Sequence, residues 1–173
     1  MIFGMSLQTF TVLHVIISLI AIAAGLIVLI GMLGSKRRAG WTALFLLATM
    51  LFLLATILTS MTGFMFPING FTPALGTEIV SLLVLAIALL ALYGKHLAGN
   101  WRWIYIATAV TALWFNVLVL IVQAFQKVAF LKAMAPTQSE PPFLIAQSAA
   151  LAIFVVLGLI AAFKFRPALA SSV

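Results

Sequence analysis

Histidine and glutamate are the residue types here best suited to acid–base or metal chemistry, and the chain has only four of them: His14, Glu78, His96 and Glu140. It contains neither cysteine nor aspartate, which excludes disulfides and thiolate metal sites. Two histidines in an apolar protein suggest haem ligation. His14, however, precedes Lys36 by 22 residues, or about 33 Å of helix, and His96 ends an inward-running segment. The two are therefore predicted at opposite membrane faces, where they cannot hold one iron. A haem shared between subunits, or one with another axial ligand, remains open.

Polar side chains collect toward one end of the predicted helices. Asn116, Gln123 and Lys127 are spaced by seven and four residues, so they share one helix face. Polar groups inside a bilayer are costly and usually face a bundle interior or a wet cavity. We therefore predict a polar pocket open to the outside, with Glu78 as its acid. The predicted lining residues are His14, Glu78, Asn116, Gln123 and Gln147.

A second interpretation of the same residues needs no ligand. Asn, Gln and Ser commonly form hydrogen bonds between membrane helices, and an acid such as Glu78 is stabilised near a helix N-terminus. No nucleophile–base pair, phosphate loop or metal-spaced cluster accompanies these residues. The sequence therefore assigns no catalytic residue, metal site or cofactor, and it does not favour an enzyme.

The elements that position these residues are apolar segments. Hydrophobic residues make up 66% of the chain and charged residues 6%, whereas a soluble domain carries about 25% charged residues. Uncharged apolar runs of about 20 residues are typical of membrane-spanning helices. The sequence predicts an all-α, polytopic transmembrane bundle, a single domain over residues 1–173. Its five spanning helices are predicted at about 8–33, 41–66, 73–97, 101–126 and 143–163.

Orientation follows from the basic residues, which accumulate in cytoplasmic loops. Two of the nine, Lys127 and Lys132, fall on one side of the predicted membrane. The other side carries Lys36, Arg37, Arg38, Lys95, Arg102, Lys164 and Arg166. The N-terminus is therefore predicted outside and the C-terminus in the cytoplasm. The net charge of +7 is explained by this topology, so no nucleic-acid partner is expected.

The longest polar connection is "KAMAPTQSEPPFLIAQ", residues 132–147, which carries Pro136, Glu140, Pro141 and Pro142. Prolines fix φ near −65° and reduce the entropy lost when a loop orders. We expect residues 132–142, here called the cap segment, to form an ordered cover over the outer helix ends and to offer a rigid surface to a partner. Glu140 can pair there with Lys127 or Lys132. The alternative is a plain connector in which the prolines only break helices.

The segments "LAGNWRWIY" (97–105), "LTSMTGFMFP" (58–67) and "APTQSEPPF" resemble a family of small, uncharacterised, multi-pass inner-membrane proteins of proteobacteria. The resemblance implies a bacterial inner-membrane location and carries over no activity. The heptad "LFLLATM" (44–50) is followed by a near copy, "LFLLATI" (51–57), where the family usually has one. The role of this repeat is left open.

Three functions are compatible with these observations. The first is an accessory or interaction subunit of a larger membrane assembly, with the lipid bilayer and a membrane-protein partner or further copies of the chain as its partners. The second is a ligand-binding or redox membrane protein whose outer pocket takes a quinone-like or other small amphipathic molecule. The third, a small-solute transporter, is supported least, because one intramembrane carboxylate and no visible inverted repeat are a weak basis for coupling.

Overall fold

The computed structural model describes residues 6–63 and 73–166, and in a few places, including residues 55–63 and Glu78, it describes the backbone alone. Every regular element within these ranges is a helix, which confirms the predicted all-α class. The long helices are α1 (Leu7–Leu33), α2 (Ala39–Gly63), α3 (Pro73–Leu89), α4 (Trp101–Lys127) and α6 (Pro141–Lys164). A π-helical turn, η1 (Leu90–Gly94), continues α3, and a short helix, α5 (Ala129–Met134), follows α4.

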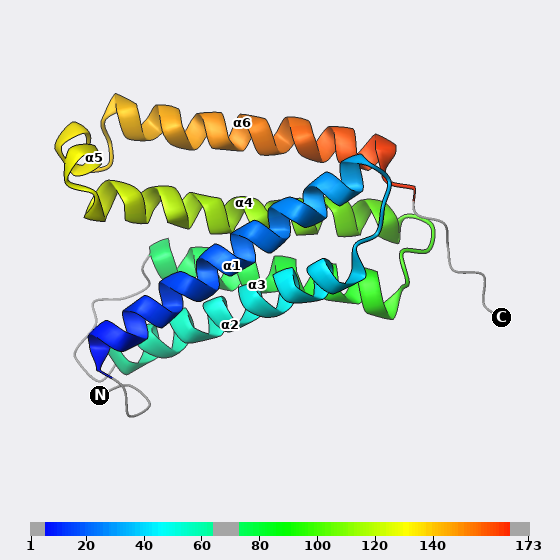
Figure 1. Cartoon of the computed structure of the whole chain (residues 1–173), viewed down its shortest axis with the longest axis horizontal. Helices are drawn as coiled ribbons and strands as arrows, with labels where there is room; N and C mark the ends of the chain where they lie inside the picture. Colours follow the sequence, from blue (N-terminus) through cyan, green and yellow to red (C-terminus); the bar gives the residue numbers. More distant parts are fainter. Residues whose placement is uncertain (1–5, 64–72, 167–173) are drawn as a thin grey trace.

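The long helices lie along one axis and successive ones run in alternating directions (Figure 1). Helix α4 is central, because it packs against α1, α3, α5 and α6. Helix α1 packs mainly on α2 and crosses α4 and α6. Helix α1 begins at the end of the bundle where α5 lies, and α6 finishes at the opposite end (Figure 1).

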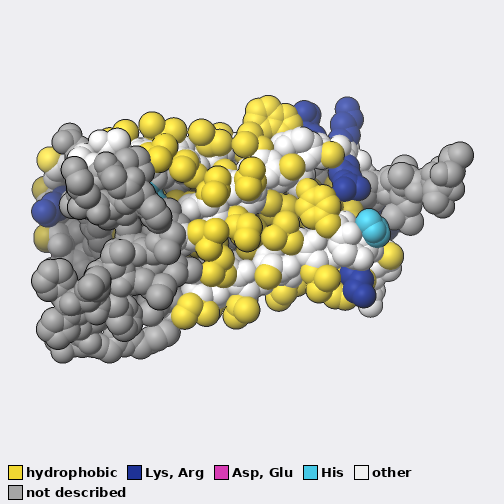
Figure 2. Space-filling view, turned by 90° about the horizontal axis from the view of Figure 1, so that it is seen from below, with side chains coloured by type: hydrophobic (Ala, Val, Ile, Leu, Met, Phe, Trp, Pro, Cys, Tyr) yellow, Lys and Arg dark blue, Asp and Glu magenta, His cyan; other side chains and the backbone are white. Residues whose placement is uncertain are grey.

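Three of the described helices are long and apolar enough to cross a membrane, namely Val12–Leu33, Trp101–Lys127 and Pro141–Lys164. The described apolar parts of α2 and α3 are shorter, Ala39–Leu54 and Ile79–Gly94. The described part of the chain therefore has three candidate membrane-spanning helices, and the full count of five spans stays a prediction. Hydrophobic side chains cover much of the described surface between the two ends (Figure 2), as expected where lipid replaces water.

Local sequence explains where α1 and α6 begin. Ser6 caps α1, since its hydroxyl accepts a hydrogen bond from the Thr9 amide at 3.1 Å. Pro141 and Pro142 occupy the first turn of α6, where a missing N–H costs little. The end of the third predicted helix differs from expectation. His96 and Leu97 adopt positive φ angles of 48° and 61°, so helical structure stops at Gly94 rather than at 97.

Small residues let the helices approach closely in the core. Ala24, Ala88 and Ala161 are completely buried. A Cβ atom at Gly25 of α1 would lie 2.6 Å from Leu113 of α4 and 2.9 Å from Phe45 of α2. Gly25 is therefore the point where three helices meet, as the small-residue logic of membrane packing predicts.

Candidate functional site

A cavity of about 510 Å³ opens among α1, α2, α3 and α4, a size within the range of about 300–1,000 Å³ common for small-molecule sites. Seven of the thirteen described residues that line it are polar, although the bundle around it is apolar. The polar residues are His14, Thr77, Ser81, Asn116, Gln123, Gln126 and Gln138, and the apolar residues are Phe52, Leu53, Phe115, Leu118, Val119 and Val122.

The inner part of the cavity is built by buried polar side chains on α3 and α4. Asn116 is 5% exposed, and its Nδ2 donates to the hydroxyl of Thr49 on α2 at 3.0 Å. Ser81 is 4% exposed, and its hydroxyl donates to the Thr77 carbonyl oxygen at 2.7 Å. A serine hydroxyl that donates one bond can still accept others, and an amide has both a donor and an acceptor end. Both side chains can therefore stabilise helix packing and present polar atoms to a ligand.

The outer part of the cavity is bordered by three glutamines. Gln138, from the connection between α5 and α6, donates from Nε2 to the Val122 carbonyl oxygen at 3.0 Å. Its Oε1 accepts from Nε2 of Gln126 at 3.4 Å. Gln123, one turn before Gln126 on the same face of α4, is exposed. The cap segment thus reaches the cavity through a single side chain, that of Gln138.

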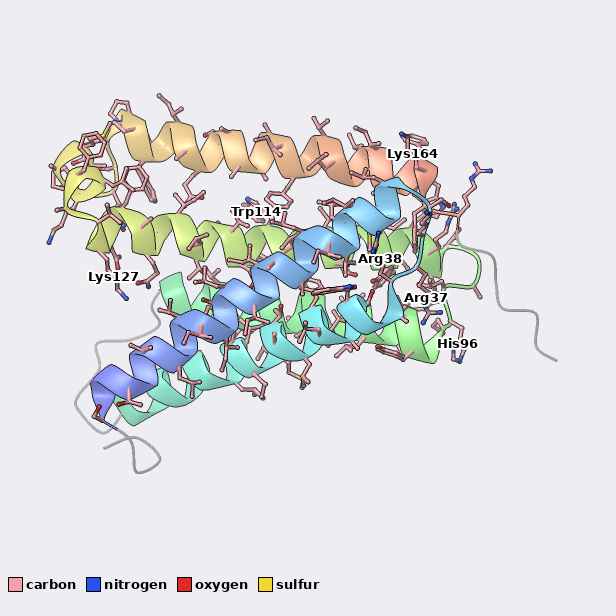
Figure 3. The ribbon with its side chains drawn as sticks, viewed as in Figure 1. Arg37, Arg38, His96, Trp114, Lys127 and Lys164 are labelled. Atoms are coloured by element: carbon pink, nitrogen blue, oxygen red, sulfur yellow. The ribbon has the colours of Figure 1, made fainter. Side chains whose placement is uncertain are left out.

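His14 completes the lining from α1. Its ring lies 4.5 Å from that of Phe52 between centroids, with an angle of 39° between the planes. His96 lies in the turn before α4, at the basic end of the bundle with Arg37 and Arg38 (Figure 3). The two histidines are therefore far apart, and their positions agree with the argument against one haem held by both.

The structure brings together three of the five predicted pocket residues, His14, Asn116 and Gln123. Gln147 is not among the described residues that line the cavity. Its Nε2 donates instead to the Leu118 carbonyl oxygen at 3.3 Å, a bond that ties α6 to α4. The side chain of Glu78 lies outside the described part of the structure, so its predicted role as the pocket acid stays a prediction.

Four polar residues of the cavity lining were not predicted. Gln126 lies three positions after Gln123 and shares its helix face, so helical spacing was a sufficient signal. Thr77 and Ser81 are four apart on α3 and carry the same signal. No sequence signal indicated Gln138, because its position depends on how the connection between α5 and α6 folds.

The cap segment is ordered by its own carboxylate. Oε1 of Glu140 accepts from the Thr137 amide at 3.1 Å and from its hydroxyl at 2.9 Å, and Oε2 accepts from the Ser139 amide at 3.1 Å. Partial desolvation alone would raise the pKa of Glu140, but these hydrogen bonds outweigh it and lower the pKa below the ordinary value of 4.5. Within the described chain these loop groups, and not Lys127 or Lys132, are the carboxylate's partners.

The cap segment sits on the ends of α4 and α6. Ala135 is completely buried, and the rings of Phe125 on α4 and Phe143 on α6 meet edge to face with centroids 5.3 Å apart. In Figure 1 the connection containing α5 joins these two helices at one end of the bundle. The expected cover over all the outer helix ends is therefore a local one, over α4 and α6, that touches the cavity at its edge.

The arrangement is suited to binding. Amide and hydroxyl groups offer donors and acceptors to a neutral head group, and the phenylalanine and valine side chains offer contact to an apolar body. The described lining contains one titratable group, His14. No family model, curated protein or solved structure matches this chain.

Proposed function

We propose that the protein is an integral membrane protein that binds a small amphipathic molecule, quinone-like in its chemistry, in the cavity among α1 to α4. The observation that carries this proposal is the concentration of seven polar side chains around one volume of about 510 Å³. Polar groups inside a bilayer require partners, because no bulk water is present there to satisfy them. A head group with carbonyl or hydroxyl oxygens would supply partners for Gln123 and Asn116, while Phe52 and Phe115 contact its apolar part.

The test is to isolate the protein gently from native membrane and extract whatever remains bound. We expect an ultraviolet-absorbing, lipid-soluble molecule in a fixed ratio to protein, identified by mass spectrometry. Gln123→Leu should reduce its retention at least several-fold, because the substitution removes a polar group from the cavity. Gln147→Leu is the matched control, because Gln147 bonds to Leu118 and does not line the cavity. Equal retention in wild type and Gln123→Leu would contradict the proposal.

An accessory role in a larger membrane assembly is the second candidate, and one observation favours it. Only 6% of the apolar window in α6 is buried, compared with 44% for α1 and 39% for α4. A helix with this much apolar surface can pack against partner helices as readily as against lipid. Co-purification of a stoichiometric subunit, lost when exposed α6 positions such as Ile153 and Val156 are changed to bulky tryptophan, would support this role.

We also propose that α2 and α3 cross the membrane, which makes five spans, and that the N-terminus faces outward in a bacterial inner membrane. The support is the charge distribution: Arg37, Arg38 and Lys164 lie at one end of the bundle and Lys127 at the other (Figure 3). A reporter fused after Val173 should be active only in the cytoplasm. Periplasmic activity of that fusion would refute the proposed topology.

A further inference from the structure

Four basic residues lie where α1 and α6 end and α4 begins, all at the same end of the bundle. The Arg166 amide donates to the Ser35 hydroxyl at 3.0 Å, which holds the end of α6 beside the segment after α1. Nη1 of Arg102 donates to the Phe165 carbonyl oxygen at 2.9 Å, which holds the start of α4 at the same place. We call this group the basic corner, and it consists of Lys36, Arg102, Lys164 and Arg166.

No described carboxylate can neutralise the basic corner. Glu140 precedes Lys164 by the whole of α6, about 36 Å of helix, while charges in salt are screened beyond about 8 Å. The backbone of Glu78 lies in the first turns of α3, a helix that runs from the far end toward the basic end. Lys36, Lys164 and Arg166 are exposed, and Arg102 keeps further N–H donors after its bond to Phe165. The corner is therefore suited to an anion.

An apolar groove of about 360 Å³ leads away from the basic corner between α4 and α6. Trp103 connects the two features, since its ring lies 4.9 Å from the Arg102 guanidinium carbon and it also lines the groove. The groove contains no charged residue among those that line it. It continues past Val110 and Gly158 to Trp114, which lies about midway along the bundle (Figure 3).

The length of the groove matches one leaflet of a bilayer. Trp103 and Trp114 are eleven residues apart on α4, about 16 Å of helix, and half of a hydrocarbon core is about 15 Å. An acyl chain starting at the basic corner would therefore end near Trp114. A partner helix would also fit an apolar groove, but it would leave the corner's positive charges without an anion.

We propose that the basic corner and the α4–α6 groove together bind one anionic phospholipid, with its phosphate at the corner and an acyl chain in the groove. The site is separate from the cavity among α1 to α4, so neither proposal depends on the other. A basic residue near an anionic lipid contributes about fivefold in affinity. Neutralising two of the four should therefore weaken binding by about twenty-five-fold.

The experiment is native mass spectrometry of the delipidated protein titrated with phosphatidylglycerol and with phosphatidylcholine of the same chain length. We expect one phosphatidylglycerol to bind tightly and phosphatidylcholine at least tenfold more weakly. The double variant Lys164→Gln/Arg166→Gln should lose this preference. Lys127→Gln/Lys132→Gln removes the same charge at the other end and should keep it. Equal loss in both variants, or equal binding of both lipids, would overturn the proposal.

Two variants test the groove. Ala107→Phe places a ring into it from an exposed position, and Ala86→Phe, on the exposed side of α3, is the control. Only the first should weaken phosphatidylglycerol binding, and circular dichroism should show both variants folded. Glycerol phosphate and inorganic phosphate, which have no acyl chain, should not displace the lipid at millimolar concentration. Displacement by them, with no effect of Ala107→Phe, would indicate a free-anion site instead. The proposal would also be contradicted if a second copy of the chain, or a bound partner polypeptide, excluded phosphatidylglycerol from this site.

Discussion

The hydrogen bond between Asn116 and Thr49 separates the two interpretations of the polar residues, helix packing and ligand binding. Asn116 takes part in both, since it donates to Thr49 at 3.0 Å and also lines the cavity. Thr49 is buried and takes part only in the packing, since it is not a lining residue. Asn116→Leu removes the bond and one polar group of the cavity. Thr49→Val removes the bond and leaves the cavity lining intact.

The expected coupling energy follows from the location of the bond. Hydrogen bonds between membrane helices contribute about 0.6 kcal/mol on average and about 1.7 kcal/mol at most. The Asn116–Thr49 bond has an ordinary length of 3.0 Å, but both side chains are at most 5% exposed, and this burial favours the upper half of that range. We expect a double-mutant cycle to give a coupling energy of about 1 kcal/mol.

The free energy of unfolding can be measured for the wild type, both single variants and the double variant by steric trapping in bicelles. Ligand retention is measured on the same four preparations. We expect both single variants to lose similar stability and only Asn116→Leu to lose ligand. A coupling energy below about 0.3 kcal/mol, which is within ordinary additivity, would show that the bond does not stabilise the bundle. Equal ligand loss in Thr49→Val would show that destabilisation, not a missing contact, empties the cavity.

Three further predictions concern packing and the cap segment. Gly25→Val should lower the free energy of unfolding by about 1–3 kcal/mol, because even a Cβ there would lie within 2.9 Å of side chains on two helices. Gly40→Ala is the control and should be neutral in the same unfolding assay, because nothing lies within 4 Å of a Cβ at that position. Because the pKa of Glu140 is lowered on folding, the stabilisation that its carboxylate contributes is complete above pH 4.5 and is lost as the pH falls through the lowered value. Hydrogen exchange at the Thr137 amide should accelerate over that acidic range. In Glu140→Gln this amide should exchange fast at every pH. Gln138→Ala should speed ligand release without changing the global unfolding free energy, as followed by stopped-flow displacement, and an unchanged release rate would refute a closing role for that side chain.

The helices themselves were predictable from the sequence, because lipid as solvent permits few alternatives to a long apolar helix. The predicted helix boundaries are wrong where the backbone angles of single residues determine the direction of the chain. His96 and Leu97 take left-handed φ angles, which few residues other than glycine adopt. The early end of the third predicted helix, at Gly94, could therefore not be predicted from its residue types. Helix α5 was missed for a related reason: its six residues are too few to show a period.

The candidate site was predictable in part, and the limit is set by how each helix is rotated. Helix α4 carries its polar residues on one face, so the positions of Asn116 and Gln123 followed from helical spacing alone. Helix α6 is apolar nearly all round, and such a helix does not show by its pattern which face packs inward. Gln147 was therefore placed with the cavity residues by its depth, although its amide bonds to Leu118 across the α4–α6 contact. Depth in the membrane follows from residue number, but the face a side chain occupies depends on the neighbouring helices. Predictions on α4 are for that reason the firmer ones, and tests of the cavity should begin with Asn116 and Gln123.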